Sequence, residues 1–343
     1  MKSSNKTMRE LKRLVRLGHW NGRIRFLLAI MAAWFRRVPA YRRLDTLLTA
    51  AKGEPHAIVM VIYCPKGMPA DTRALIQALQ HDPSIHLMII SKTPLLDQDA
   101  QFLKDQGCNI TTVANRGFDF ESYRDGVLTL LDSGVSFQKL TIMNDTFVVL
   151  NVPALMKLLI GADTPAPGGW TGFFLQGRKR ARDRHLGAFC LTFDGQVARQ
   201  RAFEQFWRAY KPSNNRDYTI RFGEIGLSKA LFSADARFDV LYERQALIRR
   251  VFDQPAETIN VIAEGLHLLE ILNDHERASL SSLDLAQRRS FLADKIANTE
   301  NLRLMPIYSL LMDLPIAKRR NLRAYPGLAA WYETHIRPIE TGT

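Results

Sequence analysis

Short apolar runs alternate with segments of helical periodicity between residues 56 and 115. The runs HAIVMVI and IHLMIIS, followed by the shorter NITT, are typical of strands, the first two of strands buried on both faces. The stretches TRALIQALQ and LLDQDAQFLKDQG between them have the spacing of helices. This order predicts an α/β fold with a mainly parallel sheet and flanking helices, in which ligands collect beyond the carboxyl ends of the strands.

The alternation of predicted helices and strands continues and then gives way to mainly helical sequence. A helix is predicted in FESYRDGVLTLLDSG, and strands are predicted in KLTIMNDT, WTGFFLQG, LGAFCLTFDG and RFDVLY. Beyond residue 214 the pattern is mostly helical, and residues 294–343 read as a basic helical tail. We therefore expect a leader over residues 1–52, an α/β domain over 53–250 and a helical C-terminal extension over 251–343.

Charge and cysteine content argue against two classes of protein. The formal charge is +13, yet twelve Lys or Arg and a single acid lie before residue 44, which leaves the remaining chain nearly neutral. A nucleic-acid-binding body would carry a basic face through the fold, so we expect no nucleic-acid partner. Cys64, Cys108 and Cys190 have no paired spacing, which argues against a zinc site or a disulfide framework and fits a reducing cytoplasm.

The basic leader contains an apolar run from Phe26 to Phe35. About twenty apolar residues are needed to cross a bilayer, so this run is too short. A basic amphipathic helix lying on an anionic membrane surface fits the pattern, with Trp20 and Trp34 at the headgroup boundary. The alternative is a helix packed on the domain with a solvated basic face.

The stretch LTIMNDTFVVL breaks an apolar run with Asn144, Asp145 and Thr146. A carboxylate at the end of a buried strand needs a partner, which water, an oriented donor or a metal ion can supply. Another polar element, Asn115 to Asp119, lies where a strand ends and a helix begins, and Gly117 there allows a ligand to approach the backbone. Both sites open onto one sheet edge, which predicts a phosphate-bearing ligand bridged by a divalent ion to Asp145. An ordinary turn or cap is the alternative.

Several motifs in order resemble the rhamnan synthesis protein F family, a set of bacterial polysaccharide glycosyltransferases. The resemblance covers about residues 58–242 and rests on these stretches: ANRGFDFESYRDGVLTLL, KLTIMNDTFVVL, GGWTGFF, RHLGAFCLTF, FEQFWRAY and FGEIGLSKAL. It implies a GT-A-like, Rossmann-type α/β fold and transfer of a sugar from a nucleotide-diphosphate donor to a lipid-linked or growing cell-surface polysaccharide. Together with the basic leader helix, this reaction predicts a cytoplasmic enzyme attached to the inner face of the cell membrane, and a deoxyhexose such as rhamnose is the expected sugar.

The resemblance implies roles for the two polar elements. The Asn-x-Gly-x-Asp region lies beside the nucleotide in such enzymes, so Asn115, Gly117 and Asp119 are expected to bind the donor. An acidic motif normally holds Mg²⁺ or Mn²⁺ against the diphosphate, and Asp145 takes this place, with Asn144 beside it. Because only one carboxylate remains, cationic side chains are the alternative to the ion.

Catalysis is expected to use Glu224 and His185, which fall on polar family motifs. Glu224 is the expected general base for the acceptor hydroxyl, and His185 is expected to contact the diphosphate or the acceptor. The alternatives are a solvated helix-cap residue and a structural histidine.

Further donor contacts are expected from Tyr123, which shares a helix face with Asp119, and from Trp170 or Trp207 stacking on sugar. Both tryptophans also fit a hydrophobic core. Residues 178–184 form a basic loop that either attracts diphosphate or is simply solvated. A rival to the enzyme is a noncatalytic GT-A-like scaffold in a membrane assembly complex, which the reduced acidic motif favours.

Overall fold

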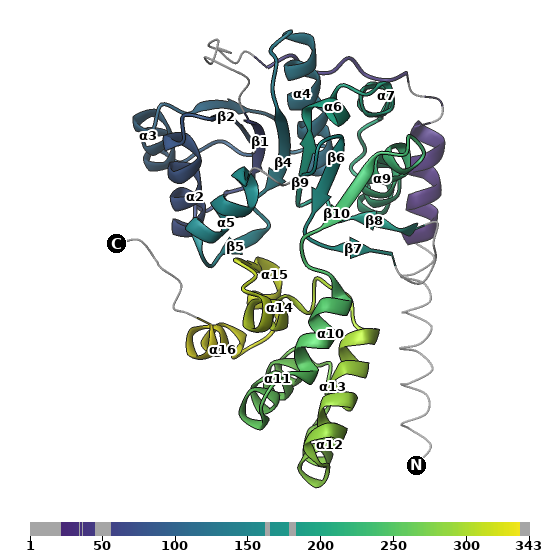
Figure 1. Ribbon diagram of the computed structural model, residues 1–343. Coiled ribbons are helices and arrows are strands. Elements are labelled where there is room, and N and C mark those ends of the chain that lie inside the picture. The colour runs from purple at the N-terminus through teal and green to yellow at the C-terminus, as the bar shows by residue number, and fades with distance from the viewer. Residues whose placement is uncertain are drawn as a thin grey trace, which may run out of the picture.

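A mixed seven-stranded sheet forms the centre of the molecule (Figure 1). The computed structural model describes residues 22–33, 35, 37–44, 56–161, 165–177 and 183–336. The strands lie in the order β10-β6-β9-β4-β1-β2-β3. Their bounds are β1 (His56–Ile62), β2 (Ile85–Ser91), β3 (Asn109–Thr112), β4 (Lys139–Asn144), β6 (Gly169–Gly172), β9 (Cys190–Asp194) and β10 (Arg237–Val240).

The pairing of these strands confirms the predicted mainly parallel sheet. β1 lies between β2 and β4 and is parallel to both, and β3 extends this parallel half. β9 runs antiparallel to β4 and β6, and β10 is parallel to β6. The strands of the β-α-β-α-β segment therefore all end at one edge of the sheet, as the sequence predicts.

Helices cover both faces of the sheet. α2 (Ala70–His81), α3 (Asp97–Asp105) and α5 (Val152–Ile160) pack with one hydrophobic cluster. α4 (Phe118–Asp132), α7 (Arg201–Ala209) and α9 (Ile225–Phe232) pack with the other, near the short α6 (Gly195–Ala198). Side chains alternate along β1, so that Ile58 and Met60 join the first cluster while Val59 and Val61 join the second. This explains why β1 is apolar at consecutive positions.

The break in LTIMNDTFVVL separates two sheets. β4 ends at Asn144, and the chain resumes as β5 (Phe147–Val149), which leaves the main sheet. β5 pairs antiparallel with β11 (Ile316–Lys318), and Lys318 stands opposite Phe147 in the register. A strand from the predicted helical tail is thus fixed beside the polar residues that end β4.

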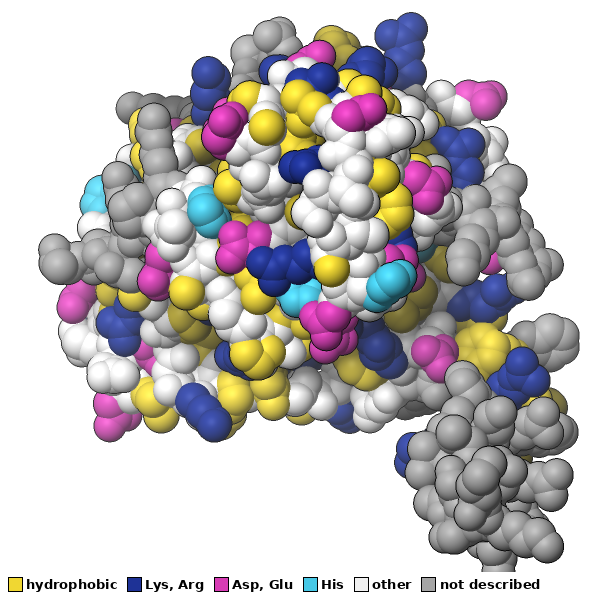
Figure 2. Space-filling view, turned by 90° about the horizontal axis from the view of Figure 1, so that it is seen from below, with side chains coloured by type: hydrophobic (Ala, Val, Ile, Leu, Met, Phe, Trp, Pro, Cys, Tyr) yellow, Lys and Arg dark blue, Asp and Glu magenta, His cyan; other side chains and the backbone are white. Residues whose placement is uncertain are grey.

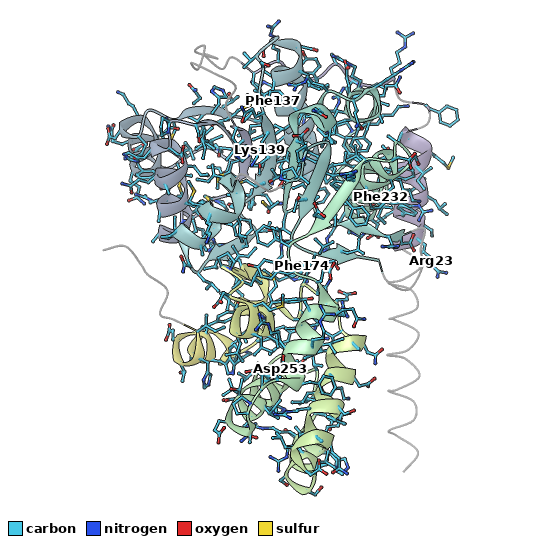
Figure 3. All side chains as sticks on the ribbon, in the orientation of Figure 1. Arg23, Phe137, Lys139, Phe174, Phe232 and Asp253 are labelled. Carbon is cyan, nitrogen blue, oxygen red and sulfur yellow. The ribbon has the colours of Figure 1, made fainter. Side chains whose placement is uncertain are left out.

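The C-terminal extension forms a helical lobe below the sheet in Figure 1. α10 (Arg244–Phe252) leads into it, and it contains α11 (Ala256–Leu268), α12 (Asp274–Ser279), α13 (Leu285–Asn298), α14 (Met305–Met312), α15 (Arg319–Ala324) and α16 (Leu328–His335). Its apolar side chains belong to the same hydrophobic cluster as Ile58 and Met60 of β1. Phe174 lies at the junction (Figure 3), and its ring centroid is 4.9 Å from that of Tyr308. Seen from below, basic and acidic side chains are interspersed on this face (Figure 2).

The described part of the leader forms a helix over residues 22–33, shown in purple in Figure 1. Phe26, Ala29, Ile30 and Ala33 pack against the hydrophobic cluster of α4, α7 and α9. Among the described helices, none combines the length and apolarity that a membrane crossing needs. The predicted helix is present, and one of its faces is docked on the domain.

Candidate active site

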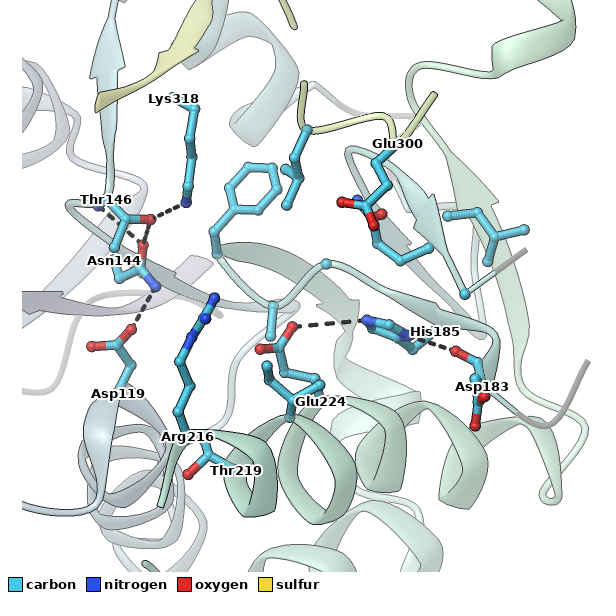
Figure 4. Close-up of a pocket in the computed structure, with 18 of the residues that line it drawn as sticks. Asp119, Asn144, Thr146, Asp183, His185, Arg216, Thr219, Glu224, Glu300 and Lys318 are labelled. Atoms are coloured by element: carbon cyan, nitrogen blue, oxygen red, sulfur yellow. Dashed lines mark hydrogen bonds and ion pairs between the residues drawn. The ribbon is translucent and has the colours of Figure 1, made fainter. Parts of the chain in front are cut away.

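A cavity of about 940 Å³ opens where β4 ends, between the main domain and the C-terminal lobe (Figure 4). Its walls come from the start of α4, the hairpin of β7 (Leu175–Gln176) and β8 (His185–Leu186), and the segment after α13. α8 (Arg216–Tyr218) and the π-helix η2 (Thr219–Glu224) supply one wall, and the end of β11 supplies the opposite one. The cavity therefore lies beyond the carboxyl end of a sheet strand, where an α/β fold is expected to bind ligands.

Four polar side chains form a hydrogen-bonded chain along one wall (Figure 4). Lys318 Nζ donates to Thr146 Oγ1 at 2.7 Å, and Thr146 Oγ1 donates to Asn144 Oδ1 at 2.7 Å. Asn144 Nδ2 donates to Asp119 Oδ2 at 2.8 Å. The chain orients the Asn144 amide, because its oxygen faces a donor and its nitrogen faces a carboxylate.

The two ends of this chain are ionisable groups with shifted pKa values. Burial raises the pKa of the Asp119 carboxyl to about 6, and the negative charge of Asp145 adds to the rise. Burial lowers the pKa of the Lys318 ammonium to about 8. Both shifts mean that the cavity disfavours charge until an opposite charge or a hydrogen-bonding ligand arrives.

Glu224 and His185 face each other on the other side of the cavity. His185 Nδ1 lies 2.8 Å from the carbonyl oxygen of Asp183, so this nitrogen carries the proton that it donates. His185 Nε2 is then turned toward Glu224 Oε2, at 3.9 Å. Burial raises the pKa of the Glu224 carboxyl, while the nearby His185 opposes the rise. A carboxylate with a raised pKa beside a polar cavity is suited to accept a proton from a ligand hydroxyl.

The π-helix sets the position of Glu224. The wider turns of a π-helix are rare and often occur at functional sites. The backbone N–H of Ile225 bonds to the carbonyl of Ile220, five residues back, so Glu224 ends the widened segment before α9. Gly223 packs directly on the ring of Phe120 from α4. The segment is thus held against α4 while Glu224 lines the cavity.

Replacing Gly223 by alanine is expected to lower the free energy of unfolding by about 1–3 kcal/mol. The added Cβ would lie 2.9 Å from Phe120 Cδ1, and that buried ring also stacks on Trp207. Urea unfolding measures the change. Gly226→Ala is the matched control, because its Cβ meets Phe206 only at 3.3 Å. Equal stability of the two variants would contradict this account of the π-helix.

The structure brings five of the predicted site residues to the cavity. These residues are Asp119, Tyr123, Asn144, His185 and Glu224. Tyr123 is fully buried, and its hydroxyl donates to the carbonyl of Ala188 at 3.2 Å, which fixes the backbone between β8 and β9. Residues far apart in the sequence thus meet in one site.

Other predicted residues lie away from the cavity. Asn115 is exposed, and Gly117 caps α4 with φ +63°, donating its N–H to Asn214 Oδ1 at 2.7 Å. Neither residue is among those lining the cavity. Gly117 is required by packing, since a Cβ there would lie 2.5 Å from Glu121 Cβ.

The two tryptophans are core residues. Trp170 and Trp207 are fully buried, and Trp170 stacks on Phe193 with ring centroids 5.9 Å apart. Neither lines the cavity, so the structure does not bring them to a sugar there. In the basic loop, residues 178–182 lie outside the described residues.

The carboxylate of Asp145 faces the end of β1. Its Oδ2 accepts hydrogen bonds from the Tyr63 N–H at 2.8 Å and from Cys64 Sγ at 3.3 Å, and Asp145 is not among the cavity-lining residues. In the described part of the chain, no three His, Cys, Asp or Glu side chains are grouped so as to hold a metal ion. Mg²⁺ prefers six oxygen ligands, so this donor set does not fit a resident ion, and metal dependence stays a prediction.

The cationic side chains that line the cavity were not predicted from the sequence. Lys318, Arg320 and Arg216 line it, and the first two come from the C-terminal extension. The run Lys318-Arg319-Arg320 was visible only as part of a basic tail. A three-residue strand such as β11 is too short for periodicity to reveal.

A family model described as rhamnan synthesis protein F matches residues 87–260, just over half of the chain. The chain belongs to the rhamnan synthesis protein F family. The resemblance stated from the motifs is therefore confirmed, and the matched region ends before β11. The uncharacterized protein y4gN of Sinorhizobium fredii is 26% identical to this chain over 175 residues. That match covers 50% of this chain and 44% of y4gN, so the chain spans less than half of that relative.

Solved structures show more distant similarity. The glycosyltransferase GlyE of Streptococcus pneumoniae TIGR4 is 13% identical, with TM-score 0.33, over 56% of this chain and 46% of GlyE. A 4-diphosphocytidyl-2C-methyl-D-erythritol synthase is 9% identical, with TM-score 0.35, over 56% of this chain and 90% of that one. Function is therefore argued from the site itself.

Proposed function

We propose that this rhamnan synthesis F protein is a glycosyltransferase that moves a sugar from a nucleotide-diphosphate donor to a saccharide hydroxyl. The observation that carries the proposal is the cavity wall formed by Glu224 and His185, opposite the chain from Asp119 to Lys318. One wall supplies a base for the acceptor, and the other supplies donors and a cation for an anionic donor. The family match supports this assignment.

The reaction is a displacement at the anomeric carbon. The acceptor oxygen forms a bond to that carbon, its proton passes to the Glu224 carboxylate, and the bond to the diphosphate oxygen breaks with its electrons leaving on phosphate. Asp119 and the Asn144 amide are placed to hydrogen-bond the nucleotide or sugar. Tyr123 holds the backbone beside this wall in place, because its hydroxyl donates a hydrogen bond to the carbonyl of Ala188.

The proposal is tested with purified full-length protein and a panel of nucleotide sugars that includes nucleoside-diphosphate rhamnose. At least one donor should release its nucleoside diphosphate, and the same donor should raise the melting temperature. A noncatalytic scaffold would bind no donor, and it would support polysaccharide formation equally well with Glu224→Ala. That pair of results would overturn the enzymatic proposal.

We also propose that the acceptor is lipid-linked and that the leader helix holds the enzyme on the inner face of the cell membrane. Its outer face exposes a continuous apolar stripe. The stripe consists of Ile24, Leu27, Leu28, Met31 and Phe35, and Phe35 is 86% exposed. Arg23 and Arg25 flank it, and Arg23 points away from the domain (Figure 3). Apolar side chains rimmed by arginine match the boundary of an anionic bilayer.

The double variant Leu27→Asp/Leu28→Asp is expected to reduce binding to anionic phospholipid vesicles by about 100-fold. Each exposed leucine contributes about 1.5 kcal/mol or more when it enters the acyl boundary. Vesicle sedimentation measures the loss. Phe252→Asp is the control, since Phe252 is a similarly exposed apolar residue, placed at the end of α10. Equal binding of the double variant and the wild-type protein would contradict the membrane proposal.

A further inference from the structure

Three cationic side chains enter the cavity from two opposite walls. Lys318 ends β11 and Arg320 is the second residue of α15, while Arg216 comes from α8 beside the π-helix. In Figure 4, Arg216 extends into the space between Asp119 and Glu224, and Lys318 descends toward the same space. Positive charge is therefore concentrated between the proposed base and the nucleotide wall.

Within the residues that the structure describes, Lys318, Arg320 and Arg216 have no carboxylate within ion-pair distance. Asp119 and Glu224 act on Lys318 only at longer range, without forming an ion pair with it. Among the described residues, the hydrogen-bond acceptor of Lys318 Nζ is the Thr146 hydroxyl, and Lys318 Nζ lies 5.4 Å from the ring centroid of Phe189. A partly buried ammonium without a carboxylate is unfavourable unless an anion binds beside it.

The neighbouring arginine shows what a structural cation looks like in this segment. Arg319 pairs with Asp71 Oδ2 at 2.8 Å and also donates to the carbonyl oxygen of Phe147 at 2.8 Å. Its donors are therefore used within the fold, where they tie α15 to α2 and β5. Lys318 and Arg320, on either side of it, line the cavity instead. The run of three cations thus combines one anchor with two groups that are available to a ligand.

The anion that suits this arrangement is a diphosphate. Guanidinium and ammonium groups bind phosphate oxygens through charge-assisted hydrogen bonds. Cations on both sides of the cavity can contact two linked phosphates at once, and they stabilise the negative charge that develops as the sugar leaves. Asp145 faces the end of β1, so a metal bridge from that carboxylate is not built into the cavity.

We propose that Lys318, Arg320 and Arg216 bind the diphosphate of the donor and take the place of a divalent ion. The inference rests on the proposed function, because it assigns a subsite within the same cavity. It also makes the C-terminal extension part of the binding site, since Lys318 and Arg320 lie beyond the region matched by the family model.

The test measures binding of inorganic diphosphate to the full chain in EDTA by isothermal titration calorimetry. Wild-type protein should bind the probe without added metal. Lys318→Met and Arg320→Ala should each weaken binding at least tenfold, in line with the loss of a charge-assisted contact. Arg323→Ala should leave it unchanged, because Arg323 is an exposed residue of α15 that does not line the cavity.

Melting temperatures show whether each variant is folded, and Arg320→Ala carries the test if Lys318→Met is unstable, because Arg320 is exposed. Failure of the wild-type protein to bind the probe without Mn²⁺, or equal affinity of Arg320→Ala and Arg323→Ala, would overturn the inference. The diphosphate subsite and the transferase activity can be refuted independently of each other. Donor turnover that requires metal and is unchanged in Lys318→Met refutes the subsite but keeps the transferase. Metal-free diphosphate binding with no turnover of any donor keeps the subsite and refutes the transferase.

Discussion

Glu224→Gln is expected to lower the turnover number about 10²–10⁴-fold, the usual contribution of a positioned general base. The glutamine amide keeps the size of the side chain but cannot accept the acceptor proton. Affinity for the donor should change little, because Glu224 is placed on the wall opposite Asp119 and Asn144. Initial rates of nucleoside diphosphate release measure the effect, with the melting temperature as the check on folding.

The pH dependence of the wild-type rate provides a second readout. Burial raises the pKa of Glu224, and the base must be ionised to act. Activity should therefore rise with pH through an apparent pKa above that of an ordinary glutamate. The residual activity of Glu224→Gln should not show this rise with pH. A variant with near wild-type turnover, or with the same rise with pH, would remove Glu224 from the role of base.

Asp119→Asn is expected to stabilise the protein by about 3 kcal/mol at pH 8. The folded-state pKa of about 6 lies above the ordinary value of 3.8, so the folded protein binds the proton more tightly than the unfolded chain. The wild-type protein therefore loses stability as pH rises from about 4 to about 6, and ionised Asp119 is unfavourable above that range. Asparagine can still accept the hydrogen bond from Asn144 but carries no charge.

Urea unfolding at pH 4 and pH 8 measures this difference, which should be small at the lower pH. Asp132→Asn is a control for which we expect the opposite change in stability, because hydrogen bonds from Arg208 and Tyr41 lower the pKa of Asp132. That variant should be less stable than the wild-type protein at pH 8. If Asp119→Asn destabilises the fold at pH 8, the charge on Asp119 is better compensated than we infer. The stabilised variant should also bind donor more weakly, since active-site charges are commonly retained at a cost in stability.

The central sheet could be predicted because its signal is local. β1, β2 and β4 are apolar at consecutive positions, and helical segments separate them, so few topologies fit. Four of the five predicted residues that meet in the cavity lie at the ends of strands or helices, and Tyr123 lies one turn further into α4. His185 and Glu224 were predicted through family motifs, since neither has a distinctive local pattern.

The rest of the site depends on contacts that the local sequence does not encode. β11 pairs with β5 across almost half of the chain, and this pairing places Lys318 beside Thr146. The π-helix before α9 has the composition of an ordinary helix, so its widened turn is not visible in the periodicity. Trp170 illustrates a different limit, because an indole that stacks on sugar and one that fills a core have the same sequence signature.

We propose the cavity between α4, the π-helix and the C-terminal extension as the donor site. A crystal structure of the full chain with a bound nucleoside diphosphate tests it most directly. The account predicts that the β-phosphate contacts Lys318 or Arg216, with the nucleoside beside Asp119 and the free space facing Glu224. A nucleotide bound outside this cavity, or one whose phosphates contact none of the three cations, would contradict it.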